Sequence, residues 1–265
     1  MRIFSPVFIS QRIYTLLNNL ENMKAVILCA GYATRLYPLT LDKPKSLLEI
    51  SGKPLLNYII EKVEKINEID EIFIVTNEKF FRDFEEWSEK CKGKFAKKIE
   101  IINDKTKTNE TRIGGIGDLD FTIREKRIDE DLLVVLGDNL FDFDLNGIFS
   151  AFKKNNEITV GVYDLKEKEQ AKNFGVFEIE NGKLTSCEEK PQNPKTTIIS
   201  TGIYFFPKRE IKKINDYMKT DKPKDGPGYL ILDFFSSQNV YAFEFKGKWF
   251  DVGTKEIYEK IKDGF

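Results

Sequence analysis

The feature that most constrains this fold is an alternation, beginning near Met23, of short apolar runs with longer segments of helical spacing. The runs at 25–29, 72–75 and 132–136 are continuous and rich in Val, Ile and Leu, as strands buried on both faces are. Residues 99–102, which include one Glu, are predicted to form a further strand. Segments 54–66 and 78–90 have the period of amphipathic helices, and a further helix is expected after Gly117. Repeated strand–helix units predict an α/β fold with a doubly wound, mostly parallel, Rossmann-like sheet.

The character of the chain changes after about Glu157, where short strands dominate. The pattern predicts strands at 159–163, 176–179, 183–187, 198–206 and 240–245, with Asn181-Gly182 as a hairpin turn. It also predicts a helix at 208–218, another beginning near Tyr229, and a last one after 249–254. No linker rich in Ser, Gly or Pro divides the halves. We therefore expect one domain, residues 23–265, that contains a smaller β-rich portion.

Residues 1–22 stand apart from this pattern. They mix apolar and basic residues without a continuous apolar core or a small-residue cleavage site. Met23 directly precedes the first apolar run and has the character of a protein start. Two interpretations stay open. Residues 1–22 are an upstream extension or result from a misassigned start codon, or they form an amphipathic helix packed on the body of the protein or on a partner.

Composition excludes several classes of function. The 42 basic and 43 acidic residues nearly cancel, which argues against nucleic acid as the main partner. No apolar run approaches the roughly 18 residues of a membrane helix. Three scattered cysteines form neither a disulfide framework nor a zinc pattern, which favours the cytoplasm. Histidine is absent, so hydrolases with a Ser-His-Asp or Cys-His centre and His-ligated zinc are excluded.

Several polar motifs follow the predicted strands. Gly31-Tyr-Ala-Thr-Arg-Leu36 comes after the first strand, where small residues let backbone amides approach an anion and Arg35 adds a bidentate phosphate donor. Asp138 follows the fourth strand and Asp251 lies in a second strand-to-loop segment; such a pair of carboxylates suits Mg²⁺. Each motif alone is more often a simple turn.

The placement of these motifs predicts one shared site. In a doubly wound sheet, ligands bind at the carboxyl ends of the strands. The loops after Ala30, Ile102 and Leu136 are therefore expected to converge. Glu188-Glu-Lys-Pro191 also ends a strand and offers a carboxylate beside an ammonium group, although a surface ion pair is its simpler interpretation.

The order of the motifs carries more information than any one of them. GYATRL at 31–36 is followed by KPK at 43–45, GDN at 137–139, EEKP at 188–191, STGIY at 200–204 and WFDVGT at 249–254. In this order they resemble the sugar-1-phosphate nucleotidyltransferases, and within that family the short enzymes similar to glucose-1-phosphate thymidylyltransferase. The resemblance extends from Met23 to about Ile261.

The resemblance implies a role for each matching residue. It implies catalytic roles for Arg35, Lys45 and Lys190, and Mg²⁺ ligation by Asp138 and Asp251. The nucleotide-binding set would be Ala30, Gly31, Tyr32, Ala33, Thr34, Glu110, Gly115 and Asp138. The sugar-binding set would be Asn139, Gly175, Glu189, Lys190, Thr201 and Gly202. Ala33 departs from the motif, which usually has a second glycine there.

The implied reaction joins a nucleoside triphosphate (NTP) to a sugar-1-phosphate, with glucose-1-phosphate as the first expectation, to give an NDP-sugar and pyrophosphate. A sugar phosphate is already an anionic nucleophile, so in-line attack with Mg²⁺ needs no histidine and no covalent intermediate. An alternative is a cytidylyltransferase for another phosphomonoester, such as inositol phosphate or phosphocholine. A catalytically idle homologue would predict loss of the motif residues, and none is lost. A dinucleotide-dependent dehydrogenase is excluded because the first loop lacks Gly-x-Gly-x-x-Gly.

The base and the assembly stay open. Glu110 falls near a glutamine that reads the base in thymidylyl and uridylyl relatives, but a carboxylate only accepts hydrogen bonds. It would accept from N3–H of thymine or uracil and equally from the amino group of cytosine, or else only shape its loop. Members of the family often form dimers or tetramers, so a homo-oligomer is an option. The sequence carries no hexapeptide repeat, and we expect no second activity.

Overall fold

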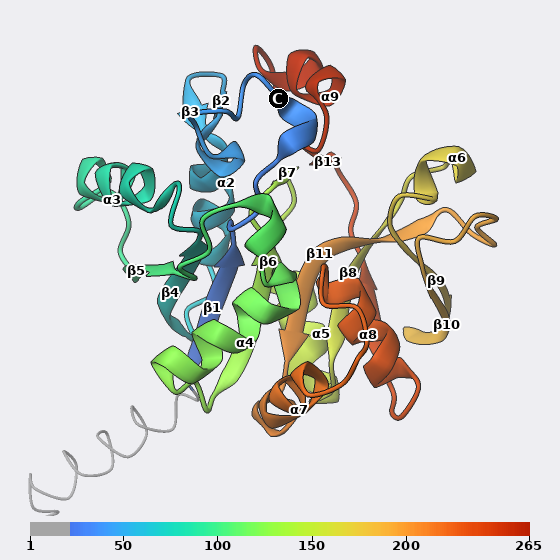
Figure 1. The fold of residues 1–265 in the computed structure, drawn as a ribbon. Coiled ribbons are helices and arrows are strands. Elements are labelled where there is room, and N and C mark those ends of the chain that lie inside the picture. The colour runs from blue at the N-terminus through green and yellow to red at the C-terminus, as the bar shows by residue number, and fades with distance from the viewer. Residues whose placement is uncertain (1–21) are drawn as a thin grey trace, which may run out of the picture.

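Strand β1 (Met23–Leu28) lies inside a sheet between two parallel neighbours, β4 (Ile69–Thr76) and β6 (Asp131–Leu136). Strand β5 (Lys98–Asn103) continues the parallel pairing beyond β4. The computed structural model describes residues 22–265 (Figure 1), so the predicted N-terminal extension lies, except for Asn22, outside the described residues. These four strands confirm the predicted parallel half of the sheet.

The sheet continues beyond β6 as a mixed sheet. Its nine strands have the order β5-β4-β1-β6-β11-β8-β12-β10-β9. Strand β11 (Ile198–Phe206) is antiparallel to both β6 and β8 (Thr159–Asp164), and β12 (Tyr241–Glu244) is parallel to β8. Strands β9 (Gly175–Glu180) and β10 (Lys183–Glu189) form the predicted hairpin at the far edge. The β-rich portion is thus part of the same mixed α/β sheet (Figure 1).

Helices cover both faces because β1 buries alternate side chains in opposite directions. Ala25 and Ile27 belong to one apolar core, whereas Val26 and Leu28 belong to the other. The first core contains residues of α2 (Leu55–Val63), α3 (Phe81–Lys90) and α5 (Asn146–Asn155). The second contains residues of α4 (Gly114–Lys126), α7 (Lys208–Met218) and α8 (Pro227–Phe235).

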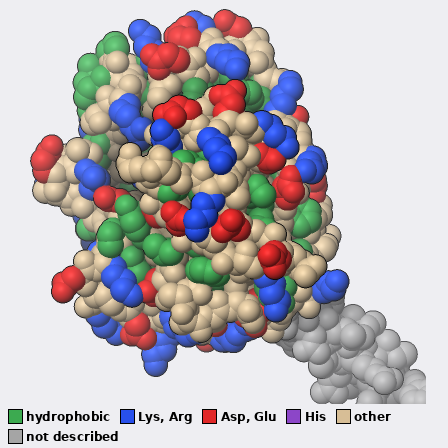
Figure 2. Space-filling view, turned by 90° about the vertical axis from the view of Figure 1, so that its right-hand side faces the viewer, with side chains coloured by type: hydrophobic (Ala, Val, Ile, Leu, Met, Phe, Trp, Pro, Cys, Tyr) green, Lys and Arg blue, Asp and Glu red, His purple; other side chains and the backbone are tan. Residues whose placement is uncertain are grey.

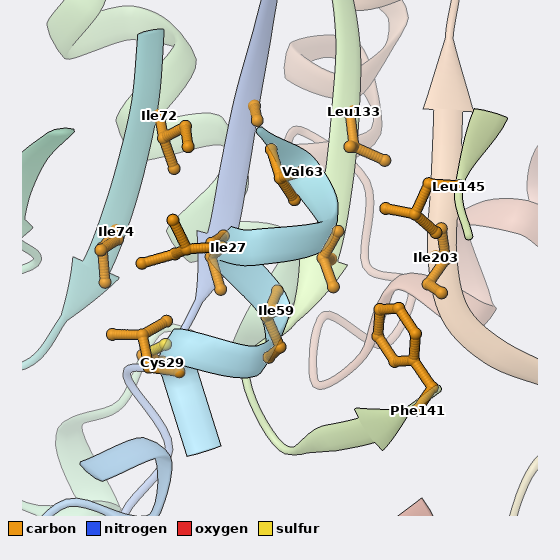
Figure 3. Packing of buried hydrophobic residues seen from close by; sticks show 14 of the residues in the cluster. Ile27, Cys29, Ile59, Val63, Ile72, Ile74, Leu133, Phe141, Leu145 and Ile203 are labelled. Atoms are coloured by element: carbon orange, nitrogen blue, oxygen red, sulfur yellow. The ribbon is translucent and has the colours of Figure 1, made fainter. Parts of the chain in front are cut away.

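Figure 3 shows the first core from close by, with α2 crossing the strands. Ile59 and Val63 of α2 lie over Ile27 of β1 and its neighbours in β4 and β6. All of these side chains are fully buried. The 3.6-residue period of α2 and the alternation of β1 therefore meet in one packed layer.

The smaller elements complete the edge where the strands end. Strand β7 (Asn139–Phe141) pairs antiparallel with β13 (Trp249–Asp251), and β2 (Glu49–Ile50) pairs with β3 (Lys53–Pro54). Helices α6 (Lys168–Ala171) and α9 (Lys255–Ile261) lie at this end of the molecule (Figure 1). Sequence patterns did not predict α5, α6 or β7, and α8 begins at Pro227 rather than near Tyr229.

The outer surface carries both signs of charge. On the face seen in Figure 2, basic and acidic side chains are interspersed and no large area of one sign appears. Within residues 22–265, no helix has the length and apolar character needed to cross a bilayer.

The packing of α5 gives a first test. Phe152 is fully buried and its ring lies 5.3 Å from the ring of Phe205 in β11. We expect Phe152→Ala to lower the free energy of unfolding by about 3–5 kcal/mol, because it leaves a cavity between helix and sheet. Urea unfolding followed by circular dichroism measures this. The exposed Lys154→Ala on the same helix is the control, and equal losses in the two variants would contradict the packing described here.

Candidate active site

The loop after β1 is held by backbone contacts at the end of the sheet. Cys29 N donates to Val75 O at 2.8 Å, and the buried Asn77 side chain donates to Ala30 O at 2.8 Å. Ala33 adopts a left-handed conformation with φ of 48°, and its carbonyl accepts a bond from Thr40 Oγ1 at 2.8 Å. The motif's usual glycine would take this conformation without the cost, about 1–2 kcal/mol, that an L side chain brings. The loop then forms a short 3₁₀ turn that carries Arg35.

Two carboxylates from distant parts of the chain meet beside this loop. Asp138 follows β6, and Asp251 ends β13, opposite Asn139 of β7. Val252 N donates to Asp138 O at 2.9 Å, which fixes the two segments against each other. Burial, and next the charge of Asp138, raise the pKa of Asp251 to about 6. The fold therefore places two like charges together at the carboxyl end of the sheet.

Lys45 compensates part of this negative charge. Its Nζ donates to Asp138 Oδ2 at 2.6 Å, and only 18% of its side chain is exposed. Burial lowers the pKa of Lys45, but the charges of Asp138 and Asp251 outweigh burial and leave the pKa above its usual value. Lys45 is thus a permanently charged ammonium group in the site.

The carboxylate pair fits a magnesium ion by its chemistry. Asp251 Oδ1 is buried and has no hydrogen-bond partner among residues 22–265, and a divalent cation would relieve the repulsion between Asp251 and Asp138. Mg²⁺ commonly takes one or two carboxylates and completes its shell with phosphate and water oxygens. Within residues 22–265 no group of three or more His, Cys, Asp or Glu side chains is placed to hold a metal. Any ion at Asp138 and Asp251 would therefore depend on ligand and water oxygens.

A first cavity, of about 250 Å³, lies between the β1 loop and the start of α4. Its walls include six residues of the predicted site: Ala30, Gly31, Ala33, Lys45, Gly115 and Asp138. The amides of Gly115 and Ile116 donate to the backbone carbonyls of Asp225 and Lys224, at 2.9 and 3.1 Å. The loop before α8 therefore closes the side of this cavity that faces α4.

A second cavity, of about 350 Å³, lies over β9, β10 and β11. It is lined by the remaining catalytic, sugar-binding and metal-binding residues predicted from sequence: Arg35, Asp138, Asn139, Gly175, Glu189, Lys190, Thr201, Gly202 and Asp251. Burial raises the pKa of Glu189, although the Lys190 charge opposes this. Gly202 has φ of +75°, and a Cβ there would lie 2.7 Å from Leu136. This bulge in β11 brings the backbone close to the end of β6.

Three predicted residues line neither cavity. Tyr32 is buried and its hydroxyl lies 3.3 Å from Thr106 Oγ1. Thr34 and Glu110 are exposed, and Glu110 belongs to a 3₁₀ turn at Asn109–Thr111. The expected convergence of loops is seen for those after β1 and β6, which both line the first cavity. The segment after β5 also reaches this cavity, through Arg112, which lines it, and through the contact between Asp104 and Asp118.

Sequence analysis missed several lining residues. Arg112 and Asp118 line the first cavity, and Lys172, Tyr204 and Trp249 line the second. The loop at 225–228 contributes to both. Its Pro-Gly pattern was visible in the sequence, but only the packing of α8 against β10 and β11 places it over the site.

The fold is a mixed α/β fold with two adjoining cavities at one end of its sheet, and comparison with known proteins identifies the family. Residues 24–264 match the family model described as nucleotidyl transferase, so the chain belongs to that family.

Among individual relatives, the bifunctional protein GlmU of Methanococcus aeolicus is 33% identical over 241 residues, 87% of this chain and 51% of the relative. A protein of Sulfolobus acidocaldarius, provisionally named a mannose-1-phosphate guanyltransferase, is 28% identical over 243 residues, 90% of this chain and 62% of the relative. This chain therefore spans between about half and two thirds of the length of these relatives.

Among solved structures, one similar fold is a complex with sucrose of a Bacillus anthracis protein provisionally named a glucose-1-phosphate thymidylyltransferase. It has a TM-score of 0.76 and 25% identity, and the match covers 91% of this chain and 94% of that protein.

The tight turn before Asp138 gives a second test. A Cβ at Gly137 would clash with Cys29 Sγ and lie 2.9 Å from Leu28 O. We expect Gly137→Ala to lower the free energy of unfolding by about 1–3 kcal/mol, because a backbone atom cannot move aside. Thermal or urea unfolding measures this. Gly31→Ala adds its methyl group where nothing lies within 4 Å, and an equal loss in that control would show that the close approach is not the cause.

Proposed function

We propose that residues 23–265 form one nucleotidyltransferase domain that transfers a nucleotidyl group from an NTP to a sugar-1-phosphate. Glucose-1-phosphate is the first candidate acceptor, and pyrophosphate is the second product. Membership in the nucleotidyl transferase family and the names of its relatives support the reaction class. Those names differ in base and sugar, so both are matters for experiment.

The observation that carries this proposal is the position of Asp138. Asp138 lines both cavities, together with Leu136 and the 226–227 segment. Two substrates bound in the two cavities would therefore meet beside Asp138, Asp251 and Lys45. A transfer reaction needs this arrangement, because the entropy of bringing two phosphates together is lost on binding rather than in the chemical step.

The first cavity suits the nucleotide. Small residues at Ala30, Gly31 and Gly115 leave its walls open to a phosphate or a base. Lys45 supplies a fixed positive charge where this cavity meets the second. The nucleotide-binding roles predicted for these residues and for Asp138 are part of this proposal.

The second cavity suits a sugar phosphate. The Glu189 side chain is 9% exposed and lies between Gly175 and Gly228, where its carboxylate can accept bonds from hydroxyl groups. Lys190 follows it in a left-handed conformation, with its backbone N–H bonded to Phe174 O at 3.0 Å. The two side chains still form a long ion pair, with Lys190 Nζ 3.9 Å from Glu189 Oε1. In this proposal the buried carboxylate contacts the sugar ring, and the more exposed ammonium group contacts its phosphate.

The chain's own residues would act by position and charge. Arg35, Lys45 and Lys190 all act electrostatically on Asp251, so they surround the point where the reacting phosphates would meet. Their charges reduce the repulsion between an anionic acceptor and the α-phosphate, and stabilise the charge that develops on pyrophosphate as it leaves. No general base is required because the sugar phosphate oxygen is already ionised. Mg²⁺ held by Asp138 and Asp251 would supply Lewis-acid stabilisation of phosphate oxygens.

The proposal is tested by pyrophosphate release from the purified chain with Mg²⁺ and glucose-1-phosphate. Each of dTTP, UTP, CTP, GTP and ATP is supplied in turn. Release with one or two of them supports the proposed reaction and identifies the base. If all five are silent, mannose-1-phosphate, glucosamine-1-phosphate, inositol phosphate and phosphocholine are tested as acceptors. Silence throughout would contradict the proposal and favour an idle homologue.

The metal role of Asp138 gives a third test. We expect Asp138→Asn to reduce turnover by about a hundredfold or more, because the amide is a poor Mg²⁺ ligand and leaves Lys45 without its counter-charge. Turnover as a function of Mg²⁺ concentration and the thermal unfolding midpoint are measured together. Asp142→Asn removes an equal charge nearby, outside both cavities, and is the control. Full turnover in Asp138→Asn would contradict the role of Asp138 as a Mg²⁺ ligand.

The sugar cavity gives a fourth test. A Cβ at Gly228 would clash with Glu189 Oε2 and lie 2.7 Å from Glu189 Cδ. We expect Gly228→Ala to raise KM for the sugar phosphate about tenfold while KM for the NTP changes little, because only the Glu189 carboxylate is displaced. Gly226→Ala, where nothing lies within 4 Å of the added methyl group, should have a smaller effect. Equal increases in the KM values for the sugar phosphate and for the NTP would contradict a role of Glu189 in binding the sugar alone.

A further inference from the structure

Asp118 is a buried carboxyl group to which the sequence motifs assign no role. It lies in the first turns of α4, is 6% exposed, and lines the first cavity. Its carboxyl group is within hydrogen-bonding reach of Asp104, which follows β5. Asp118 Oδ1 is buried, and the part of the chain that the structure describes offers it no hydrogen-bond partner.

Asp104 is held by donors on its other side. Its Oδ1 accepts from Thr106 N at 2.6 Å and its Oδ2 from Thr106 Oγ1 at 3.0 Å. Tyr32 can donate in turn to Thr106 Oγ1, at 3.3 Å. These bonds favour a charged Asp104, whereas Asp118 has no donor to stabilise a charge. A proton shared by the two carboxyl groups therefore resides on Asp118 and is donated to Asp104.

The electrostatics agree with this arrangement. Burial first, and then the charge of Asp104 and the bond to it, raise the pKa of Asp118 to about 8. Together with the donors that hold Asp104, this raised pKa favours the neutral acid form of Asp118 near pH 7. With its O–H directed at Asp104, its remaining oxygen is an acceptor that lacks a donor. A buried acceptor without a partner is unfavourable, and a ligand N–H in the cavity would satisfy it.

We propose that Asp118 is a specificity-determining residue that accepts a hydrogen bond from the nucleotide base, and that Asp104 is the positioning residue that holds its proton. This inference rests on the proposed assignment of the first cavity to the nucleotide. It moves base recognition from the exposed Glu110, which lines neither cavity, to the buried end of α4. A neutral acid also avoids placing a second negative charge beside the triphosphate.

Other titratable groups face the pair from each neighbouring element. Tyr32 and Cys29 come from the β1 loop, and burial raises the pKa of both, that of Cys29 to about 12. Glu78 follows β4 and acts on Asp104. Arg112, Asp225, Lys45 and Asp138 line the same cavity, the first two joined at 3.2 Å and the last two at 2.6 Å.

The test measures NTP binding by calorimetry from pH 6.5 to 9.5, without sugar phosphate. The ligand is the nucleotide that supports pyrophosphate release. For the wild type we expect the affinity for the NTP to fall above about pH 8, because Asp118 then loses its proton and places a negative charge beside the triphosphate. Asp118→Asn mimics the neutral acid, so its affinity for the NTP should stay constant over the pH range in which that of the wild type falls. Titration of the nucleotide itself affects both proteins equally and is therefore controlled for.

Truncation separates base recognition from phosphate binding. We expect Asp118→Ala to weaken NTP binding about tenfold or more at pH 7 and to leave tripolyphosphate binding unchanged. Asp118→Asn should recover most of the lost NTP affinity. Asp104→Asn supplies an amide donor that stabilises a charged Asp118, so the fall in affinity should move to lower pH. Asp120→Asn is the matched control, because buried Asp120 in the same helix bonds to Arg124 and Asn215 and lines neither cavity.

The outcomes distinguish the inference from the proposed function. Equal losses for NTP and tripolyphosphate in Asp118→Ala, or the same fall in affinity in Asp118→Asn as in the wild type, would overturn the inference alone. A wild type that binds none of the five nucleotides would overturn both. Preserved turnover with unchanged base preference and pH profile in all Asp118 variants would leave the proposed function intact and show that Asp118 only supports the fold.

Discussion

The pairing of β7 with β13 is the constraint on which the site depends. It joins segments far apart in the sequence and fixes Asp138 beside Asp251, two groups that repel each other. Backbone hydrogen bonds supply the force that holds them, and Lys45 reduces the repulsion by its bond to Asp138. The same pairing joins the two cavities, since Asp138 is common to their walls. In the proposed function, substrate binding, metal ligation and the meeting of two phosphates would thus depend on one short antiparallel ladder.

Much of the fold could be predicted because burial on both faces leaves a strong trace in the sequence. Strands β1, β4 and β6 each contain a continuous apolar run for that reason. Helix α5 was not predicted, although Ile148 and Phe152 have helical spacing, and Gly147 in its first turn lowers the helix propensity of the segment. A Cβ at Gly147 would lie 2.5 Å from Phe243 Cζ, so the packing of α5 on β12 requires a glycine at this position. No local sequence pattern shows this contact. The antiparallel insertion of β11 beside β6 likewise depends on long-range pairing.

The candidate site was predictable where its residues end strands and less so where loops set the geometry. Asp138, Asp251 and Lys190 lie at strand ends and line the cavities as the motifs suggested. Glu110 turns outward in a 3₁₀ segment closed by the bonds between Thr108 and Thr111, and its role in base recognition stays a prediction without structural support. Asp118 could not be predicted as a site residue from the sequence, because an aspartate near the start of a helix usually faces water. Its burial depends on the segments at 104–106 and 224–227, which are distant in the sequence.

The site holds two pairs of carboxyl groups, and their surroundings direct them to opposite tasks. Three cations, Lys45, Arg35 and Lys190, act on Asp251 beside Asp138 and hold down the pKa that burial raises. Among residues 22–265, no cation acts comparably on Asp118 beside Asp104, and the pKa of Asp118 is raised further. The first pair therefore has positive charge around it, as the proposed metal site needs, whereas the environment of Asp118 favours the protonated form, which suits a neutral partner. Because both pairs adjoin the first cavity, this difference alone would direct a divalent cation toward Asp138 and an uncharged base toward Asp118.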